Sequence, residues 1–435
     1  MRWSAGFTLL LLMPMACAQT TSSNTVVEVG PKTVLPAPNK QTIPTVNIAP
    51  AVGWPAGSMP TAAAGLRVQA FATGLDHPRW LYVLPNGDVL VAETNAPPKP
   101  GEKGGFKAWV MKRTMKKAGS AVPSANRIRL LRDADGDGVA ELQQVFLANL
   151  MSPFGMALIG DQLYIANADA IVRVPYQSGQ TSIAATPVKV ADLPGGPINH
   201  HWTKSLVASA DGTHLYAGIG SNSNVGENGL QNETDRAAIL EVDVATGQHR
   251  VFASGLRNPV GLAWQPGTKA LWVVVNERDE IGDQLVPDYL TRVREGAFYG
   301  WPYSYYGQHV DARVKPQDPA KVAQAIAPDY ALGAHVAALV LTFSQARGFP
   351  ATYANGAFIG LHGSWNRAKP VGYKVVFVPF ASGQPDGMPI DVLTGFLDKD
   401  GNARGRPVGV AFDQHGALLV ADDVGNTLWR VSSAP

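Results

Sequence analysis

This chain has one cysteine, a small net charge and almost no segment with helical periodicity. The single cysteine, Cys17, lies in an apolar N-terminal stretch, so the remainder has no disulfide and no thiol chemistry. Charged residues make up 16% of the sequence and sum to +2, which provides no footprint for nucleic acid or for an anionic membrane. A doubly wound α/β fold needs amphipathic runs of about 10–15 residues between strands. Residues 66–431 contain no such run apart from a short candidate near 318–326.

The N-terminus has the features of an export signal. Arg2 precedes an apolar run, and Ala16-Cys17-Ala18 forms a small-x-small cleavage pattern. The run is too short to span a bilayer as a helix. We expect residues 1–18 to be a signal peptide and the protein to be periplasmic or secreted, without a membrane span. A lipoprotein anchored through Cys17 is the alternative. Residues 19–62, rich in Thr, Pro, Asn and Ala, are expected to be a flexible tether.

One pattern recurs through the rest of the chain: a polar or proline-containing loop, an apolar strand, a glycine turn and a second apolar strand. Its six occurrences lie at 74–94, 152–176, 200–221, 256–277, 354–380 and 405–431. Alternating apolar residues around N-G, D-G or H-G turns indicate hairpins. Six such units predict that residues 63–435 form an all-β, six-bladed β-propeller with its active site in the central channel. We expect 66–75 to close the ring against TLWRV in the last unit.

Polar residues that precede the first strand of each unit should converge on the central channel. The segments are His77-Pro78-Arg79, His200-His201-Trp202, Arg257-Asn258-Pro259, Trp365-Asn366-Arg367 and Arg404-Gly405-Arg406-Pro407. They are rich in Arg and His and contain no acids, which favours a positive pocket for a polyanion held by guanidinium–carboxylate pairs. The alternative is that each arginine caps a blade or pairs with a neighbouring acid.

Several segments together carry a family resemblance. They are HHWTKSLVASADG, LRNPVGLAW, VNERDEIGDQLVPDYLTRV, GAFYGWPYSYYG, HGSWNRAKPVGY and RGRPVGVAF. In this order and spacing the chain resembles the soluble aldose and sorbosone dehydrogenases that depend on pyrroloquinoline quinone (PQQ), most closely the sorbosone branch. The resemblance implies PQQ and Ca²⁺ as cofactors, a small-molecule sugar or aldehyde substrate, and an electron acceptor that it does not name.

The resemblance also implies roles for individual residues. His201 matches the general base, for which a neutral imidazole is suited. Arg257 and Asn258 match the pair at the quinone oxygens, where Arg257 would also stabilise developing negative charge. The matches for the cofactor carboxylates are Arg404, Arg406 and, at a position where relatives use lysine, Asn366 or Arg367, of which Arg367 is preferred for its charge.

This sequence departs from the family at the group that orients the base. The glucose-oxidising relatives have an aspartate there, whereas this chain has Ser221. Asn222, Asn224 or Glu227 could substitute for it.

Two segments are candidates for calcium. In the first, Asn276–Glu280, backbone carbonyls or Glu277 could supply hard oxygen ligands, with Arg278 and Asp279 beside it. The second is the turn with Asp133, Asp135 and Asp137, spaced as at the start of an EF-hand loop, but Gln144 stands at the twelfth position. Strand-like residues flank this turn, so we expect a hairpin that could bind structural calcium and has no catalytic role.

Two other readings of the propeller stay open. One is a lactonase or hydrolase with a central divalent metal, which needs three or four acidic or amide side chains converging on the ion. The other is a non-catalytic binding scaffold, because fold alone does not define function. For the dehydrogenase, Tyr303, Tyr305, Tyr306 and the insertion 307–350 are expected to wall the pocket.

Overall fold

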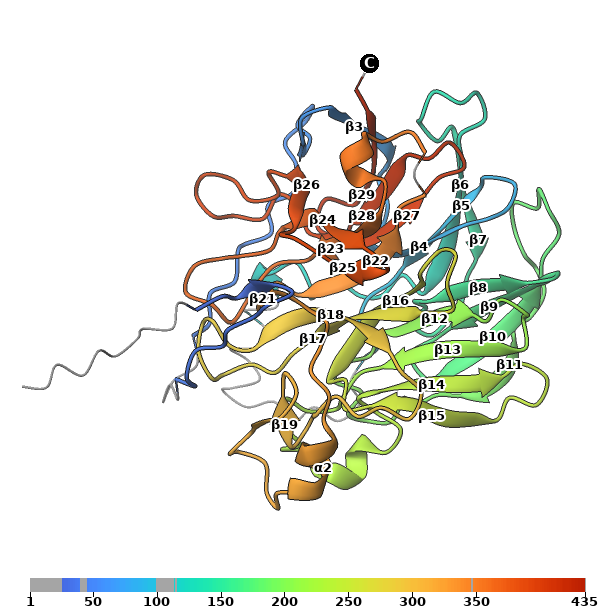
Figure 1. Cartoon of the computed structure of the whole chain (residues 1–435). Coiled ribbons are helices and arrows are strands. Elements are labelled where there is room, and N and C mark those ends of the chain that lie inside the picture. Colours follow the sequence, from blue (N-terminus) through green and yellow to red (C-terminus); the bar gives the residue numbers. More distant parts are fainter. Residues whose placement is uncertain (1–25, 40–44, 99–112, 114–115, 346, 435) are drawn as a thin grey trace, which may run out of the picture.

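The protein is built almost wholly of antiparallel β-strands. A computed structural model describes residues 26–39, 45–98, 113, 116–345 and 347–434. The expected signal peptide and Cys17 lie outside these residues. Six sheets, each with four strands of the repeat, surround one centre (Figure 1). The prediction of an all-β, six-bladed propeller is confirmed.

The blades follow one another along the chain, each with its innermost strand first. Blade 1 contains β4 (Pro78–Val83), β5 (Val89–Glu93), β6 (Arg127–Arg132) and β7 (Leu142–Leu147). Blade 2 contains β8 (Met156–Ile159), β9 (Gln162–Ala166), β10 (Ala170–Pro175) and β11 (Val188–Asp192). Blade 3 contains β12 (Lys204–Ala208), β13 (His214–Ile219), β14 (Ala238–Asp243) and β15 (His249–Ser254).

The second half of the ring repeats this order. Blade 4 contains β16 (Asn258–Trp264), β17 (Leu271–Asn276), β18 (Pro287–Val293) and β21 (Tyr330–Ala334). Blade 5 contains β22 (Ala338–Phe343), β23 (Gly356–Leu361), β24 (Lys374–Ala381) and β26 (Ile390–Thr394). Blade 6 contains β27 (Pro407–Phe412), β28 (Leu418–Asp422), β29 (Thr427–Ser433) and β3 (Leu66–Thr73).

The ring closes through the first long strand of the chain. β3 pairs antiparallel with β29, in a register that runs from Thr73 opposite Thr427 to Leu66 opposite Ser433. This pairing is the closure predicted for 66–75 with TLWRV. It removes the free edges that an open ring would expose to other chains.

Burial falls from the middle of each blade outwards. All five residues of β5 and of β28 are buried, because both faces of these strands pack against neighbouring blades. The outer strand β7 instead exposes three consecutive residues, Gln143 to Val145. Position in the blade therefore explains why the second strands are continuous apolar runs and why the outer strands are more polar.

The repeat assignment was wrong in blade 5. The unit at 354–380 contains the second and third strands of that blade, β23 and β24. The innermost strand is β22, which lies within the insertion expected to wall the pocket, as does β21 of blade 4. The GAHVAALVLTF segment carries no glycine turn of the repeat, so it does not show the repeat pattern.

The insertion between β18 and β21 also holds a small hairpin, β19 (Ser304–Tyr305) and β20 (His309–Val310), and the helix α2 (Pro319–Gln324). The short helix expected near 318–326 is thus confirmed. It begins after Asp318, whose carboxylate accepts a hydrogen bond from the Lys321 N–H. In the part of the chain that the structure describes, no helix has the length and apolar character needed to cross a membrane.

The segment expected to be a tether makes defined contacts where the structure describes it. Its strands β1 (Val29–Gly30) and β2 (Thr61–Ala62) extend blades 4 and 5 by pairing with β21 and β26. Figure 1 shows the dark-blue β1 region beside β21. Ile48 and Ala49 are buried against the propeller. The described parts of 19–62 are therefore docked along the ring.

Candidate active site at one mouth of the channel

The six innermost strands run in the same direction along the channel, so their first residues share one end of it, here named the site mouth. Because neighbouring strands are antiparallel, the second strand of each blade ends at this mouth. Loops between second and third strands therefore join the segments that precede the innermost strands. This topology brings together residues that are far apart in sequence.

A cavity of about 400 Å³ occupies the other half of the channel. The later residues of all six innermost strands line it, including Trp80, Tyr82, Trp264 and Phe412. The charged residues predicted for the site lie outside this cavity, at the site mouth. The charged residues and this cavity are thus separated along the channel axis.

His201 lies just before β12 with its ring held by the loop after β13. Its Nδ1 is 2.8 Å from the carbonyl oxygen of Ser221 and 3.1 Å from the Ser221 hydroxyl. A carbonyl only accepts, so Nδ1 carries the proton and Nε2 carries the lone pair. Burial, with the charges of Arg257 and His200, holds the pKa of His201 well below 6.5. The neutral form of this ring is therefore the stable one near neutral pH.

Arg257 and Asn258 lie beside His201. Arg257 directs its guanidinium to the carbonyl oxygens of Asn224, Asn276 and Glu277 and to the side chains of Asn224 and Asp279. All five of its N–H groups thus have an acceptor.

Asn258 is buried and its Oδ1 has no partner among the described residues. Gly220 lies between this amide and His201. A Cβ on Gly220 would lie 2.4 Å from Asn258 Oδ1 and 2.4 Å from His201 Cβ, so only glycine permits this approach.

The predicted calcium segment after β17 is occupied by ion pairs. Asp279 contacts Arg257 at 3.1 Å and His335 at 3.2 Å, and Arg278 contacts Asp311 at 3.0 Å. Burial raises the pKa of Glu277 to about 7, and its Oε1 has no partner among the described residues. Arg278 could reach a metal only through its backbone carbonyl, since its side chain is a cation. Glu277 Oε1 is thus a buried side-chain oxygen of this segment that is left for a ligand.

A second buried cluster lies across the mouth, around Asp423 at the end of blade 6. Its Oδ2 is 2.6 Å from Arg79 Nη1, 2.9 Å from His362 Nε2 and 3.5 Å from His77 Nε2. Burial would raise the pKa of Asp423, but His362, His77 and Arg79 together lower it. Burial lowers the pKa of His362 to about 4. Asp423 is thus an ionised carboxylate shared by three side chains from blades 1 and 5.

The three arginines expected at the cofactor carboxylates have different surroundings. Arg367 pairs with Glu28 of the N-terminal segment at 3.0 Å. Arg404 lies beside Asp398, whose pKa is lowered mainly by Asn402 and in part by the Arg404 charge. Arg406 is 5% exposed and has no carboxylate in an ion pair among the described residues.

The predicted positive pocket is partly neutralised by acids. Arg79, Arg257, Arg278 and Arg367 all have carboxylate partners, supplied by loops after second strands, by the 307–350 insertion and by the N-terminal segment. Pairing with acids, the alternative weighed above, holds for these four. Among the predicted site arginines, Arg406 is the buried one without a carboxylate partner in the described part of the chain, so its guanidinium is left for an acidic ligand.

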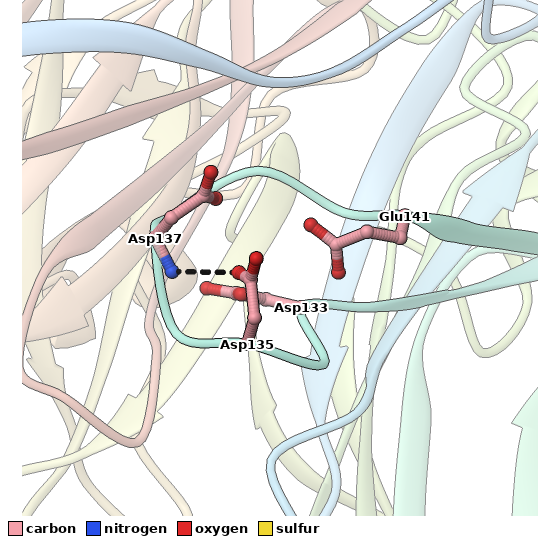
Figure 2. Close-up of side chains that lie close together, drawn as sticks. All are labelled: Asp133, Asp135, Asp137 and Glu141. Atoms are coloured by element: carbon pink, nitrogen blue, oxygen red, sulfur yellow. Dashed lines mark hydrogen bonds between the residues drawn. The ribbon is translucent and has the colours of Figure 1, made fainter.

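The acidic turn lies between β6 and β7, at the opposite face from the site mouth. Figure 2 shows Asp133, Asp135, Asp137 and Glu141 directed toward a common space. One ligand oxygen from each lies within 4.8 Å of the others. Among the described residues, this is the group in which three or more His, Cys, Asp or Glu side chains lie close enough together to hold a metal ion. The expected hairpin between strands is confirmed, and Glu141 joins the three predicted aspartates.

Sequence reasoning missed the residues contributed by second-strand loops and by the N-terminal segment. Ser221 itself orients His201, while Asn222, Asn224 and Glu227 hold the surrounding loop. His362 and Asp423 follow the second strands β23 and β28, whereas the prediction concerns residues before first strands. Arg367, predicted on that basis, also follows β23 and does not lie in a loop before a first strand. The alternation of strand direction within a blade is the signal that could have found them.

Comparison with known proteins agrees with this architecture. The family model described as TrAA12-like matches residues 124–292 and 306–434, more than half of the chain. An uncharacterised protein of Borreliella burgdorferi is 30% identical over 292 residues, which cover 65% of this chain and 76% of that protein. The chain is thus a six-bladed β-propeller. It belongs to the TrAA12-like family, which confirms the family resemblance seen in the motifs.

Solved structures share the fold at low sequence identity. A Trichoderma reesei member of carbohydrate-active enzyme family AA12 is 20% identical, with a TM-score of 0.68 over 90% of this chain and 100% of that one. The PQQ domain of pyranose dehydrogenase from Coprinopsis cinerea, in its holo form, is 20% identical, with a TM-score of 0.69 over 89% and 100%. The soluble aldose sugar dehydrogenase of Escherichia coli is 15% identical, with a TM-score of 0.58 over 85% and 100%.

Proposed function

We propose that this protein is an exported, PQQ-dependent oxidoreductase that oxidises an aldose or a sorbosone-like aldehyde, with His201 as general base and Ca²⁺ as a second cofactor. The observation that carries the proposal is the His201 ring, fixed by the Ser221 carbonyl so that Nε2 is the accepting atom. Family membership supports the reaction class, since solved relatives of this fold include PQQ-bound sugar dehydrogenases.

The residues at the site mouth fit an acidic quinone. Arg406 is a buried guanidinium without a carboxylate partner and with an unpaired Nε, which suits a ligand carboxylate. The unpaired Asn258 Oδ1 and Glu277 Oε1 are further buried polar atoms that await a partner. Arg367 would need to release Glu28 to take part, and Arg404 lies beside Asp398. Arg406 and Asn258 are therefore the first candidates to hold the cofactor.

When bound, the quinone would accept the two electrons of a substrate carbon–hydrogen bond as hydride. His201 would take the substrate hydroxyl proton at Nε2, because Nδ1 is already committed to Ser221. Arg257 would act through its charge: it keeps His201 neutral and favours negative charge on the substrate oxygen as the proton leaves. Its five N–H groups already have acceptors, so this role needs no new hydrogen bond.

The test uses the full chain purified without cofactor. PQQ is added with or without Ca²⁺, and dye reduction is followed across a panel of aldoses, aldehydes and lactones. The proposal expects dye reduction with at least one aldose or aldehyde that requires PQQ. Lactone hydrolysis without PQQ would favour the hydrolase, and PQQ binding without turnover of any substrate would favour a binding scaffold.

We also propose that the acidic turn binds a structural calcium ion. Four carboxylates supply the oxygen ligands that Ca²⁺ prefers, and backbone N–H groups of the turn already hold them in place. Calcium should raise the melting temperature of the parent protein, and Asp135→Asn should reduce that increase. Dye-reduction activity at saturating PQQ should not change in Asp135→Asn, because the turn lies at the opposite face from the site mouth. Equal calcium stabilisation of parent and variant would contradict this assignment.

A further inference from the structure

A stretch of the N-terminal segment, residues 45–54 and here named the strap, crosses blades 5 and 6 at the site mouth. The backbone N–H of Asn47 donates to the Trp365 carbonyl at 2.9 Å, and its side-chain amide donates to the Ala368 carbonyl at 2.6 Å. Further along, the Pro50 carbonyl accepts from Ala403 at 2.7 Å. The strap thus contacts the loop after β23 and the segment that precedes β27.

Trp54 anchors the end of the strap in blade 6. Its indole packs edge-on against Phe396 and Trp429, with ring centroids 5.5 Å apart in both cases. Its Nε1 donates to Asp422 Oδ2 at 2.7 Å. Asp422 is fully buried, and its other oxygen accepts the backbone N–H of Arg406 at 2.7 Å. One carboxylate therefore links Trp54 to the backbone of Arg406.

The side chain of Arg406 lies against the same strap. Nη2 donates to the Ala49 carbonyl at 3.2 Å, and the guanidinium carbon lies 5.0 Å from the centre of the Tyr373 ring. Nε is buried and has no hydrogen-bond partner among the described residues. Leaving a charged donor unpaired in a protein interior is costly, so this arrangement is one that a negatively charged acceptor would complete.

We propose that the strap is a positioning element of the ligand pocket, in which Trp54 and Ala49 hold Arg406 ready for a ligand carboxylate. This inference rests on the proposed function, because the carboxylate would be that of the quinone. Arginine has many rotamers, and holding it beforehand reduces the entropy lost on binding. Trp54 acts through Asp422 and through the docking of Ala49, so it need not touch the ligand.

The experiment compares two conservative variants of the full chain. Trp54→Phe keeps an aromatic ring and removes the N–H that reaches Asp422. The matched control is Trp272→Phe in blade 4. Trp272 is buried whereas Trp54 is half-buried, but like Trp54 it packs edge-on against two aromatic rings, here Phe380 and Phe343, and its Nε1 donates to Gln265 at 3.1 Å. Calorimetric titration with PQQ in the presence of Ca²⁺ should show binding weakened about tenfold by Trp54→Phe. Trp272→Phe should bind as the parent does.

A double variant identifies the residue through which the strap acts. If the strap works by holding Arg406, then adding Trp54→Phe to Arg406→Ala should weaken PQQ binding no further. Additive losses, or parent-like binding by Trp54→Phe, would overturn the inference and leave the proposed function standing. A parent chain that does not bind PQQ would overturn both. Circular dichroism checks folding, and if Trp54→Phe is unfolded, Asn47→Ala loosens the other end of the strap under the same criteria.

Discussion

The two sides of the site mouth place a histidine in opposite surroundings. On the side of blades 3 and 4, a backbone carbonyl of Ser221 holds His201, and cations surround the ring. On the side of blades 5, 6 and 1, the ionised carboxylate of Asp423 holds His362. Both rings are hydrogen-bonded through one nitrogen. They differ in whether the partner carries charge.

The difference separates a reactive role from a structural one. Burial lowers the pKa of both rings, so both are neutral near neutral pH. The Ser221 carbonyl fixes the tautomer of His201 without adding charge and leaves Nε2 to gain a proton from a substrate. Asp423 is committed to Arg79 and His77 as well as to His362, and it joins three blades at one point. We infer that His201 serves chemistry and that the Asp423 cluster maintains the shape of the mouth.

Replacement of His201 should give the largest effect on turnover. In His201→Ala the positioned base is lost, so dye reduction at saturating PQQ and substrate should fall by about 10²–10⁴-fold. Binding of PQQ, measured by titration, should persist. The comparison with the other side is direct, because His362→Ala should lower turnover much less.

His200→Ala is the control for this experiment. His200 is exposed whereas His201 is half-buried, and the two rings contact edge-on with centroids 4.7 Å apart. The control should keep near-parent turnover at neutral pH. Full activity in His201→Ala with loss of activity in His200→Ala would assign the role of general base to His200. Loss in His362→Ala as large as in His201→Ala would end the distinction between the two sides.

Removal of the shared charge should give the largest effect on stability. Asp423→Asn leaves Arg79 buried without its anion, which costs about 3–5 kcal/mol in comparable buried pairs. The free energy of unfolding, from urea titration followed by circular dichroism, should fall accordingly. Asp391→Asn, which breaks an exposed pair with Lys374, is the control and should change stability by less than about 1 kcal/mol. Equal stability of the two variants would show that the Asp423 cluster does not join the blades.

PQQ binding should distinguish Arg406 from Arg404, to which the sequence analysis assigns the same role. Arg406→Ala should weaken PQQ binding by about 1.5–3 kcal/mol, the range for hydrogen bonds to charged groups. Arg404→Ala should have a smaller effect, because Arg404 is half-buried and lies beside Asp398. Calorimetric titration of both variants measures the difference. A larger loss in Arg404→Ala would place the carboxylate pocket further out in blade 6.

Sequence analysis predicted the propeller and its closure because alternation and turn residues mark every blade except the start of blade 5. It placed His201, Arg257, Asn258 and Arg406 at the mouth because these residues lie at or shortly before the start of innermost strands. It did not foresee the acids that neutralise most arginines. Glu28, Asp279 and Asp423 reach the mouth only through tertiary packing, and no local pattern links Glu28 to Arg367 across 339 positions.

The smallest predicted effect is a shift in the pH dependence of turnover, which distinguishes His201 from His200. His201 is active when neutral and its pKa lies well below 6.5, so turnover should stay level at neutral pH and fall only as pH drops below 6.5. The unfolded chain binds that proton near 6.5 whereas the folded chain does not, so folding stability also declines with acid. Circular dichroism at each pH must therefore show intact protein. His200→Ala removes a nearby positive charge and should move the inflection of the rate profile to slightly higher pH. A shift to lower pH, or an inflection above 6.5 in the parent, would contradict a neutral His201 surrounded by cations.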